Sequence, residues 1–224
     1  MSSSSQMPEP DNPLPADRLS QASDLAKAEH VLVHACCGPC LEYPARQMLS
    51  EGMSLTVYGY NPNIHPLVEH QRREENMVRL TEKLGLTCYV DSLSQPDFWV
   101  KHEDTTETRC RMCYRVRLEA TARKARDLGI PFFTTTLLVS PYQDQEMICE
   151  AGREAASRYG VQFYARDFRP GYREGQNLAR EDGLYRQRYC GCLPSIDQSK
   201  FKDQILKEHA DLLASQKASD NVRI

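Results

Sequence analysis

The amino-acid sequence contains no long apolar run, only one tryptophan and no large excess of charge of either sign. Because a membrane-spanning helix needs about 20 apolar residues in succession, the sequence predicts no membrane span and no membrane partner. Residues 1–21 lack a basic stretch followed by an apolar core, which is the pattern of a secretory signal. We therefore expect a cytoplasmic protein.

The formal net charge of the 224 residues is only −3. Such a balance excludes a uniformly basic nucleic-acid-binding protein, although it leaves room for a local basic surface. Apolar residues make up 40% and charged residues 26% of the chain, as in ordinary globular domains. A chain of this length can bury a core large enough to fold without disulfide bonds.

Cysteine, by contrast, is plentiful, because the chain has nine. An odd number fits poorly with a closed set of disulfide bonds, and clustered thiols in a reducing compartment usually bind metal or carry out redox chemistry. Cys88 and Cys149 stand alone in apolar surroundings and are expected to be small buried side chains. The other seven lie in three short motifs: Cys36, Cys37 and Cys40 in HACCGPC, Cys110 and Cys113 in RCRMC, and Cys190 and Cys192 in YCGC.

The chain divides into a tail, one domain and a second tail. Residues 1–24 hold four prolines among serine, aspartate and glutamine, a composition that predicts a disordered N-terminal tail. Residues 25–216 show no repeat and no break in composition, which predicts a single metal-binding catalytic domain. Residues 217–224 are expected to form a flexible C-terminal tail.

Strand and helix patterns alternate along this domain. Buried strands are predicted at 30–35, 55–60, 86–92, 130–141 and 161–168, and helices at 41–52, 67–85, 110–129, 144–160 and about 196–214. This alternation predicts an α/β, Rossmann-like three-layer fold with a mostly parallel sheet. Ligands of such sheets bind beyond the C-terminal ends of the strands, so we expect the metal centres there.

The number of clustered thiols limits the kinds of site they can form. A C-x-x-C motif brings two thiolates to one metal, which is why it recurs in zinc and iron–sulfur sites. Seven thiols exceed one tetrahedral zinc site, whereas a [4Fe–4S] cluster uses four and leaves three for a second metal. The neighbours Cys36 and Cys37 are expected to diverge and to serve different centres. The spacing favours iron–sulfur, with structural zinc and a dithiol redox pair as alternatives.

Six motifs, in order, resemble those of the QueH-type epoxyqueuosine reductases. The resemblance implies reduction of the epoxide of epoxyqueuosine in tRNA to queuosine, without cobalamin. It also implies a [4Fe–4S] cluster, a neighbouring mononuclear iron or other divalent metal, and an external electron donor. The motifs cover about residues 31–196: HACCGPC, YGYNPNIHP, ETRCRMCYRVRLEATA, FFTTTLLVSPYQ, RDFRPGY and YRQRYCGCLPS.

The same resemblance suggests how the thiols are divided. Some relatives carry aspartate where this chain has Cys40, which points to the mononuclear metal at that position, because a carboxylate can replace a thiolate there. The predicted ligands of the mononuclear metal are therefore Cys36, Cys40 and Cys192. Those of the [4Fe–4S] cluster are Cys37, Cys110, Cys113 and Cys190.

Conversion of an epoxide to an alkene takes two electrons and two protons and releases water, so a proton donor must lie near the metals. Asp167, His65 and Tyr189 are the predicted catalytic donors. His34 lies inside an apolar strand, which favours a packing role.

The anticodon stem-loop of tRNA, the implied partner, needs a basic and aromatic surface. Arginines are dense at 107–126 and at 164–189, and the second stretch interleaves them with aromatic residues that can stack on bases. The predicted substrate-binding residues are Asn61, Asn63, Arg109, Arg115, Ser140, Tyr142, Gln143, Arg169, Tyr172, Arg186 and Gln187.

Two other functions are compatible with these residues. One is a zinc-stabilised RNA-binding module without redox chemistry. The other is a dithiol oxidoreductase in which one C-x-x-C pair cycles through a disulfide. The CRMC motif disfavours this last function, because it is expected to open an arginine-rich helix outside any thioredoxin-like context.

Overall fold

The computed structural model describes residues 29–92, 99 and 106–221, with side chains given up to residue 215. The predicted tail at 1–24 lies outside these residues. Backbone 217–221 continues the last helix, whereas 222–224 again lie outside the described part. The division of the chain into one domain and two tails therefore stays a prediction. Within the described residues, no helix combines the length and the apolar character that crossing a bilayer requires.

A five-stranded, fully parallel sheet forms the middle layer. Its strands lie in the order β3 (Thr87–Asp91), β2 (Ser54–Tyr60), β1 (His30–His34), β4 (Phe132–Thr135) and β5 (Gln162–Phe163). Val31, Leu32 and Val33 of β1 are fully buried, as expected for a central strand covered on both faces. This arrangement confirms the predicted α/β fold.

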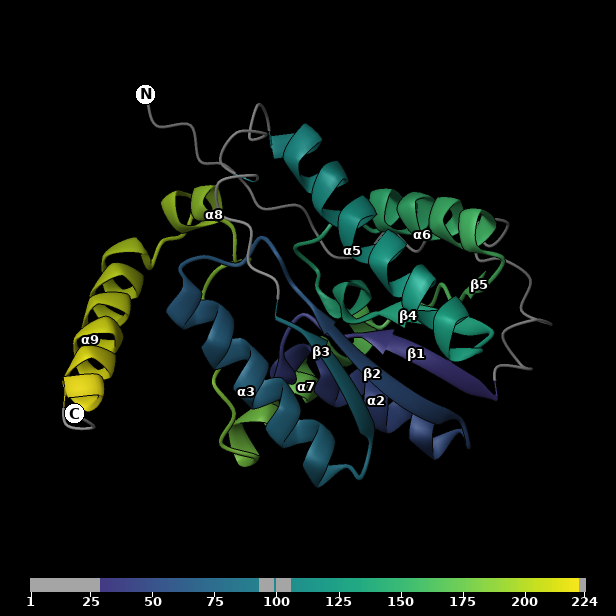
Figure 1. Ribbon diagram of the computed structural model, residues 1–224, viewed down its shortest axis with the longest axis horizontal. Helices are drawn as coiled ribbons and strands as arrows, with labels where there is room; N and C mark the ends of the chain where they lie inside the picture. The colour runs from purple at the N-terminus through teal and green to yellow at the C-terminus, as the bar shows by residue number, and fades with distance from the viewer. Residues whose placement is uncertain (1–28, 93–98, 100–105, 222–224) are drawn as a thin grey trace.

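Helices cover both faces of the sheet (Figure 1). One layer holds α2 (Gly38–Ser50), α3 (Leu67–Lys83) and α7 (Tyr172–Glu181), and the other holds α5 (Thr106–Leu128) and α6 (Gln145–Tyr159). The short helix α8 (Leu193–Asp197) and the long helix α9 (Lys202–Asn221) follow, and α9 contacts α3.

The strand order reverses direction between β1 and β4, which is the switch point where doubly wound sheets bind ligands. Residues 35–37 follow β1, and the 3-10 turn η1 (Thr136–Val139) follows β4. The backbone N–H of Cys36 donates to the Thr136 hydroxyl at 3.1 Å, which ties the two strand ends together. The HACCGPC motif therefore lies at the expected ligand-binding edge.

Several element boundaries differ from the sequence prediction. Helix α2 begins at Gly38, three residues earlier than expected, because Pro39 suits a first helical turn. Helix α5 begins at Thr106, so CRMC lies inside the helix and does not open it. Strands β4 and β5 are shorter than predicted. Helix α7 was not predicted, since Gly171 and Gly175 argue against a helix. The predicted helix at 196–214 is the pair α8 and α9.

Candidate metal centre

Cys36, Cys37 and Cys40 form the first thiol group, at the N-terminus of α2. Their sulfur atoms all lie within 4.8 Å of one another, and all three residues are buried. The sulfur atoms of Cys36 and Cys37 are 3.7 Å apart, so the expectation that these neighbours diverge is wrong. The chain around Cys37 is extended before it enters the helix, and this conformation lets both side chains reach the same space. Three thiols at this spacing suit a single metal ion.

One thiol of this group is predisposed to ionise. Hydrogen bonds with the thiols of Cys37 and Cys40 hold the pKa of Cys36 well below its ordinary value, and Thr136 adds an O–H donor 3.4 Å from the Cys36 sulfur. Burial instead raises the pKa of Cys37. The positive end of α2 also favours negative charge at this point.

The second thiol group consists of Cys110 and Cys113 on α5 and Cys190 and Cys192 in the segment before α8. It is looser than the first group, because no three of its sulfur atoms lie within 4.8 Å of one another. Burial raises the pKa of Cys110, and the neighbouring Cys190 and Cys192 raise it further. The same causes raise the pKa of Cys113 to about 12, although Arg117 opposes them. Four thiols that repel one another as anions fit a shared cationic centre, because metal binding removes the cost of ionising them.

These groups differ from the predicted division of ligands at two positions. Cys37 lies within 4.8 Å of Cys36 and Cys40, whereas the charge of Cys192 acts on Cys110 and Cys113. The individual ligand roles stay predictions.

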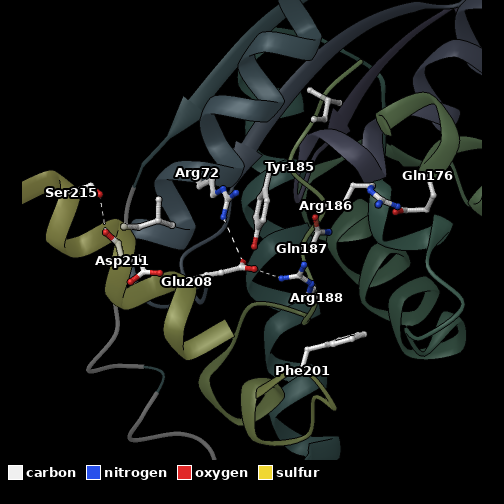
Figure 2. A pocket seen from close by; sticks show the side chains of 12 residues that line it. Arg72, Gln176, Tyr185, Arg186, Gln187, Arg188, Phe201, Glu208, Asp211 and Ser215 are labelled. Carbon is white, nitrogen blue, oxygen red and sulfur yellow. Dashed lines mark hydrogen bonds and ion pairs between the residues drawn. The ribbon is translucent and has the colours of Figure 1, made fainter. Parts of the chain in front are cut away.

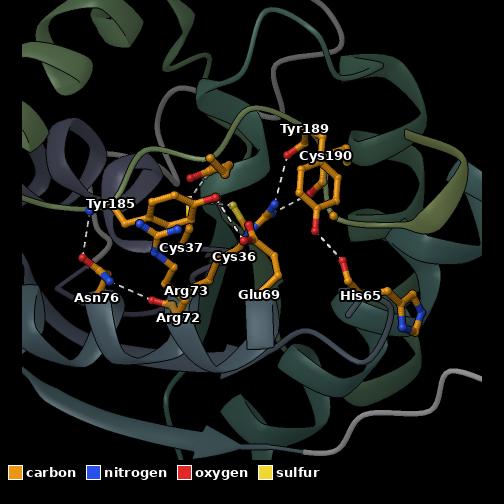
Figure 3. Close-up of polar contacts among 12 residues, drawn as sticks. Cys36, Cys37, His65, Glu69, Arg72, Arg73, Asn76, Tyr185, Tyr189 and Cys190 are labelled. Carbon is orange, nitrogen blue, oxygen red and sulfur yellow. Dashed lines mark hydrogen bonds and ion pairs between the residues drawn. The ribbon is translucent and has the colours of Figure 1, made fainter. Parts of the chain in front are cut away.

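A buried ion pair holds the backbone of the second group. Arg73 donates to Glu69 Oε1 at 2.7 Å, to the Cys190 carbonyl at 2.7 Å and to the Tyr189 carbonyl at 3.0 Å (Figure 3). Tyr185 donates to the other oxygen of Glu69 at 3.0 Å. Both members of the pair are almost fully buried, so α3 fixes the position of the Cys190 segment.

Gly191 lets this segment approach α3 closely. Its φ of +135° lies in a region that side chains disfavour. A Cβ added there would lie 2.9 Å from Ile64 and 3.1 Å from Arg73. The backbone N–H of His65 donates to the Gly191 carbonyl at 2.8 Å. The glycine of YCGC therefore allows two cysteines to flank a point of tight backbone contact.

Amide N–H groups point at the sulfur atoms of both thiol groups. Asn63 Nδ2 lies 3.1 Å from Cys113 Sγ, and Gln143 Nε2 lies 3.5 Å from Cys190 Sγ. Gln187 Nε2 lies 2.8 Å from Cys37 Sγ and 3.6 Å from Cys40 Sγ. Such donors stabilise thiolates and surround thiolate-bound metals. The donor set therefore fits metal binding through sulfur, including the implied iron–sulfur cluster.

The predicted proton donors have partners away from the thiols. The Tyr189 hydroxyl donates to the His65 carbonyl. Figure 3 shows the His65 ring on the side away from Cys36 and Cys37, and burial lowers the pKa of that ring. Burial raises the pKa of Asp167, but the bonds from Arg169 at 2.6 and 2.8 Å outweigh it and lower the pKa. These contacts give Tyr189 and Asp167 structural partners, whereas His65 Nε2 is buried without a hydrogen-bond partner among the described residues. The catalytic roles of all three residues stay predictions.

His34 has a packing role. Its Nδ1 accepts from the Thr135 hydroxyl at 2.8 Å, and its Nε2 donates to the Tyr60 carbonyl at 3.1 Å. Burial, followed by the charge of Arg117, lowers the pKa of His34 to about 4. The ring therefore stays neutral and links three strand ends.

The predicted substrate-binding residues fall into two sets. Asn61, which donates to the Ala35 carbonyl at 3.0 Å, Asn63 and Arg109 are buried or half-buried near the strand ends. The others lie on or near the surface: Arg115 pairs with Glu119, Arg169 with Asp167, and the Ser140 hydroxyl accepts from the N–H of Tyr142. Tyr142 is 72% exposed and makes an edge contact with Tyr172.

A cavity of about 670 Å³ is lined by residues of α3, α7, α9 and the segment 184–188 (Figure 2). Its wall includes Arg186 and Gln187, and Gln187 also reaches the sulfur atoms of Cys37 and Cys40. Arg72 covers the ring of Tyr185 at 3.4 Å from the ring centroid. Arg72 and Arg188 both pair with Glu208 of the same wall, so the cavity carries charges of both signs. Gln187 connects the cavity to the first thiol group.

Sequence reasoning missed four residues of this site: Glu69, Arg73, Arg117 and Thr136. Thr136 could have been found as the residue after a strand at the switch point. The other three lie within strongly charged helices, where a buried charge is indistinguishable in sequence from a solvated one.

Comparison with known proteins assigns the chain to a family. Residues 31–198 match the family model described as "Epoxyqueuosine reductase QueH". The chain belongs to the QueH epoxyqueuosine reductase family. An epoxyqueuosine reductase is an oxidoreductase of queuosine biosynthesis in tRNA, so this membership confirms the predicted family and favours redox chemistry over a structural zinc module.

Curated QueH relatives match most of the chain. The protein from Dehalococcoides mccartyi is 35% identical over 75% of this chain and 93% of its own. The protein from Thermotoga maritima is 36% identical over 77% of this chain and 93% of its own. The protein from Haemophilus influenzae is 31% identical over 81% of this chain and 78% of its own. A solved structure of a predicted subunit of a tRNA methyltransferase from Methanocaldococcus jannaschii matches 67% of this chain and 75% of its own. Its TM-score of 0.44 and sequence identity of 16% are too low to bear on function.

Proposed function

We propose that this protein reduces the epoxide of epoxyqueuosine in tRNA with electrons delivered through thiolate-bound iron. Both C–O bonds of the epoxide break, a C=C bond forms, and the oxygen leaves as water after uptake of two electrons and two protons. The observation that carries the proposal is the buried group of Cys36, Cys37 and Cys40 at the switch point of a doubly wound sheet, together with four further thiols on α5 and before α8. The work on tRNA and the predicted lack of a membrane partner fit a cytoplasmic location.

The two thiol groups suggest a new division of ligands. We assign Cys110, Cys113, Cys190 and Cys192 to a [4Fe–4S] cluster, and Cys36, Cys37 and Cys40 to a mononuclear iron or other divalent metal. Three protein ligands leave a coordination position open, as in catalytic metal sites. When bound, these groups would supply electrons, one at a time, and a Lewis acid for the epoxide oxygen.

The residues of the chain hold and shield this centre. Thr136 and Gln187 direct an O–H and an N–H toward the first thiol group, and Asn63 directs an N–H toward the second. Arg73 keeps the Cys190 segment in place. These contacts fix the sulfur atoms before a substrate arrives, which lowers the reorganisation that binding requires.

The cavity beside Gln187 is the proposed entrance for the modified nucleotide. Arg72, Arg186 and Arg188 line it with the rings of Tyr185 and Phe201, beside the carboxylates of Glu208 and Asp211. Guanidinium and aromatic groups suit phosphates and bases of a single-stranded loop. A base at the centre of an anticodon loop must leave its stack to reach buried metals. An external donor supplies the electrons.

The test is incubation of iron- and sulfide-reconstituted, reduced protein with tRNA that carries epoxyqueuosine, followed by nucleoside mass analysis. The expected result is loss of one oxygen atom from the modified nucleoside. An unchanged mass, with iron and sulfide content verified, overturns the proposal.

A matched pair of variants supports this test. Cys110→Ala removes a proposed cluster ligand and is expected to lower both iron content and turnover, whereas Cys88→Ala, on β3, is expected to retain both. Stoichiometric zinc without iron or sulfide in anaerobically purified protein would instead support a zinc-stabilised RNA-binding module.

A further inference from the structure

Arg117, on α5, is a buried cation without an acidic partner among the described residues. Its side chain is only 2% exposed. Both Nε and Nη2 donate to the same acceptor, the Asn63 side-chain oxygen, with Nε at 3.1 Å. No carboxylate of the described residues lies within 4.0 Å of its guanidinium, and an amide oxygen does not neutralise a charge. Burial of an uncompensated ion is strongly unfavourable.

The other fully buried arginine near the thiols shows what Arg117 lacks. Arg73 is equally buried, but Glu69 lies 2.7 Å away and carries the opposite charge. Figure 3 shows that pair with its guanidinium and carboxylate facing each other. Of these two deeply buried guanidinium groups, Arg73 has a carboxylate partner, whereas Arg117 has none among the described residues.

Asn63 connects Arg117 to the thiols. The Asn63 amide that accepts from Arg117 also donates to Cys113 Sγ at 3.1 Å, which makes a chain from guanidinium through amide to sulfur. Burial lowers the pKa of Arg117, but the charges of Cys113, Cys36 and Cys190 outweigh it and raise that pKa. The guanidinium thus interacts with members of both thiol groups.

We propose that Arg117 is the buried counter-ion of the metal-bound thiolates and, through Asn63, raises the reduction potential of the centre they hold. This proposal rests on the proposed function for the identity of that centre. A nearby positive charge and N–H donors to sulfur favour the more negative, reduced state of an iron–sulfur centre. Arg117 is a positioning residue, since it acts on the reaction through the thiolates.

The proposal makes the stability effect of Arg117 depend on metal loading. In metal-free protein no metal-bound thiolates face the guanidinium, so the buried charge is compensated less fully and contributes less to stability than in loaded protein. In loaded protein the thiolates compensate it. A residue that merely packs would stabilise both forms alike.

The first test compares Arg117→Gln, which loses the charge but keeps an amide donor, with Arg117→Lys, which keeps the charge. The matched control is Arg126→Gln, because Arg126 lies exposed near the end of the same helix and pairs with Asp127. Redox titration of loaded protein is expected to show a more negative midpoint potential for Arg117→Gln. Arg117→Lys should retain most of the wild-type value, and the control should keep all of it.

The second readout is urea unfolding of metal-free and of loaded protein. Arg117→Gln is expected to lose less stability, relative to wild type, in the metal-free form than in the loaded form. An unchanged midpoint potential in Arg117→Gln, or a loss of stability that is equal in the metal-free and loaded forms, overturns the proposal.

Asn63→Asp gives an independent test if Arg117→Gln does not fold. The new carboxylate lies where Arg117 already donates, so it should stabilise metal-free protein toward urea and shift the midpoint potential of loaded protein to more negative values. Failure of both changes overturns the inference. Wild-type protein that takes up no iron and sulfide would overturn the proposed function. Urea unfolding of the metal-free variants would then still show whether the buried charge of Arg117 destabilises the metal-free fold.

Discussion

The two thiol groups are built in different ways. Cys36, Cys37 and Cys40 come from five consecutive positions at one strand end and one helix start. The second group joins two cysteines on α5 to two in the segment before α8, far apart in the sequence. One group depends on local backbone geometry, and the other depends on contacts that only the folded chain provides.

Each thiol group therefore depends on a different structural feature. The first group needs α2 to start correctly at Gly38. The second group needs the Glu69–Arg73 pair and Gly191 to hold the Cys190 segment against α3. Substitutions can therefore disturb one group and spare the other.

The largest expected effect follows from Glu69→Gln. It leaves Arg73 buried without a counter-charge, which costs about 3–5 kcal/mol of unfolding free energy and loosens the Cys190 segment. We expect loss of acid-labile sulfide and a lower urea midpoint. The control Glu150→Gln breaks an exposed pair with Arg111 and should cost less than about 1 kcal/mol. Equal losses in the two variants would contradict the role given to Glu69.

Gly191→Ala is expected to disturb the second thiol group at the turn between Cys190 and Cys192. The backbone strain at φ +135° and the contacts with Ile64 and Arg73 should cost about 1–3 kcal/mol and displace Cys190 and Cys192. Iron and sulfide assays are expected to show loss of the cluster. In Gly129→Ala the added Cβ meets no atom within 4 Å, so that variant should lose only about 1 kcal/mol and keep its iron.

Gly38→Ala is the corresponding change in the first group. The added Cβ would lie 2.8 Å from the Asn76 carbonyl oxygen, so α2 must move away from α3. This movement should cost about 1–3 kcal/mol of unfolding free energy. We expect a loss of the mononuclear metal with retained sulfide, measured by metal and sulfide analysis on the same sample. Parallel loss of both would show that the two groups are one cooperative unit.

Gln187→Leu removes the amide donor 2.8 Å from Cys37 without removing a thiol. Loss of such a supporting donor typically lowers metal affinity by about 10–100-fold. The affinity of the first group should fall in a chelator competition, while sulfide content stays constant. Gln143→Leu, which removes a longer contact to Cys190, should have a smaller effect on the second group.

The sequence predicted the fold class because apolar runs such as HVLVHA and the amphipathic helices are local signals. It also predicted all seven thiols of the two groups, because a motif such as C-x-x-C carries its chemistry in its spacing. It did not predict which thiols lie together. Cys36 and Cys37 have their sulfur atoms 3.7 Å apart because of the way the chain enters α2. The position of the Cys190–Cys192 segment depends on the close approach of Gly191 to Ile64 and Arg73.

By itself, the sequence determined the alternation of strands and helices, the cysteine motifs at the binding edge and the resemblance to a tRNA-modifying reductase. Each depends on residues close together in the chain. Only the tertiary structure decided that Glu69, Arg73 and Arg117 are buried beside the thiols, since charged helix residues look alike in sequence until packing removes water from some of them. The physical reason is that the energy of a charge depends on what surrounds it, and distant segments supply those surroundings.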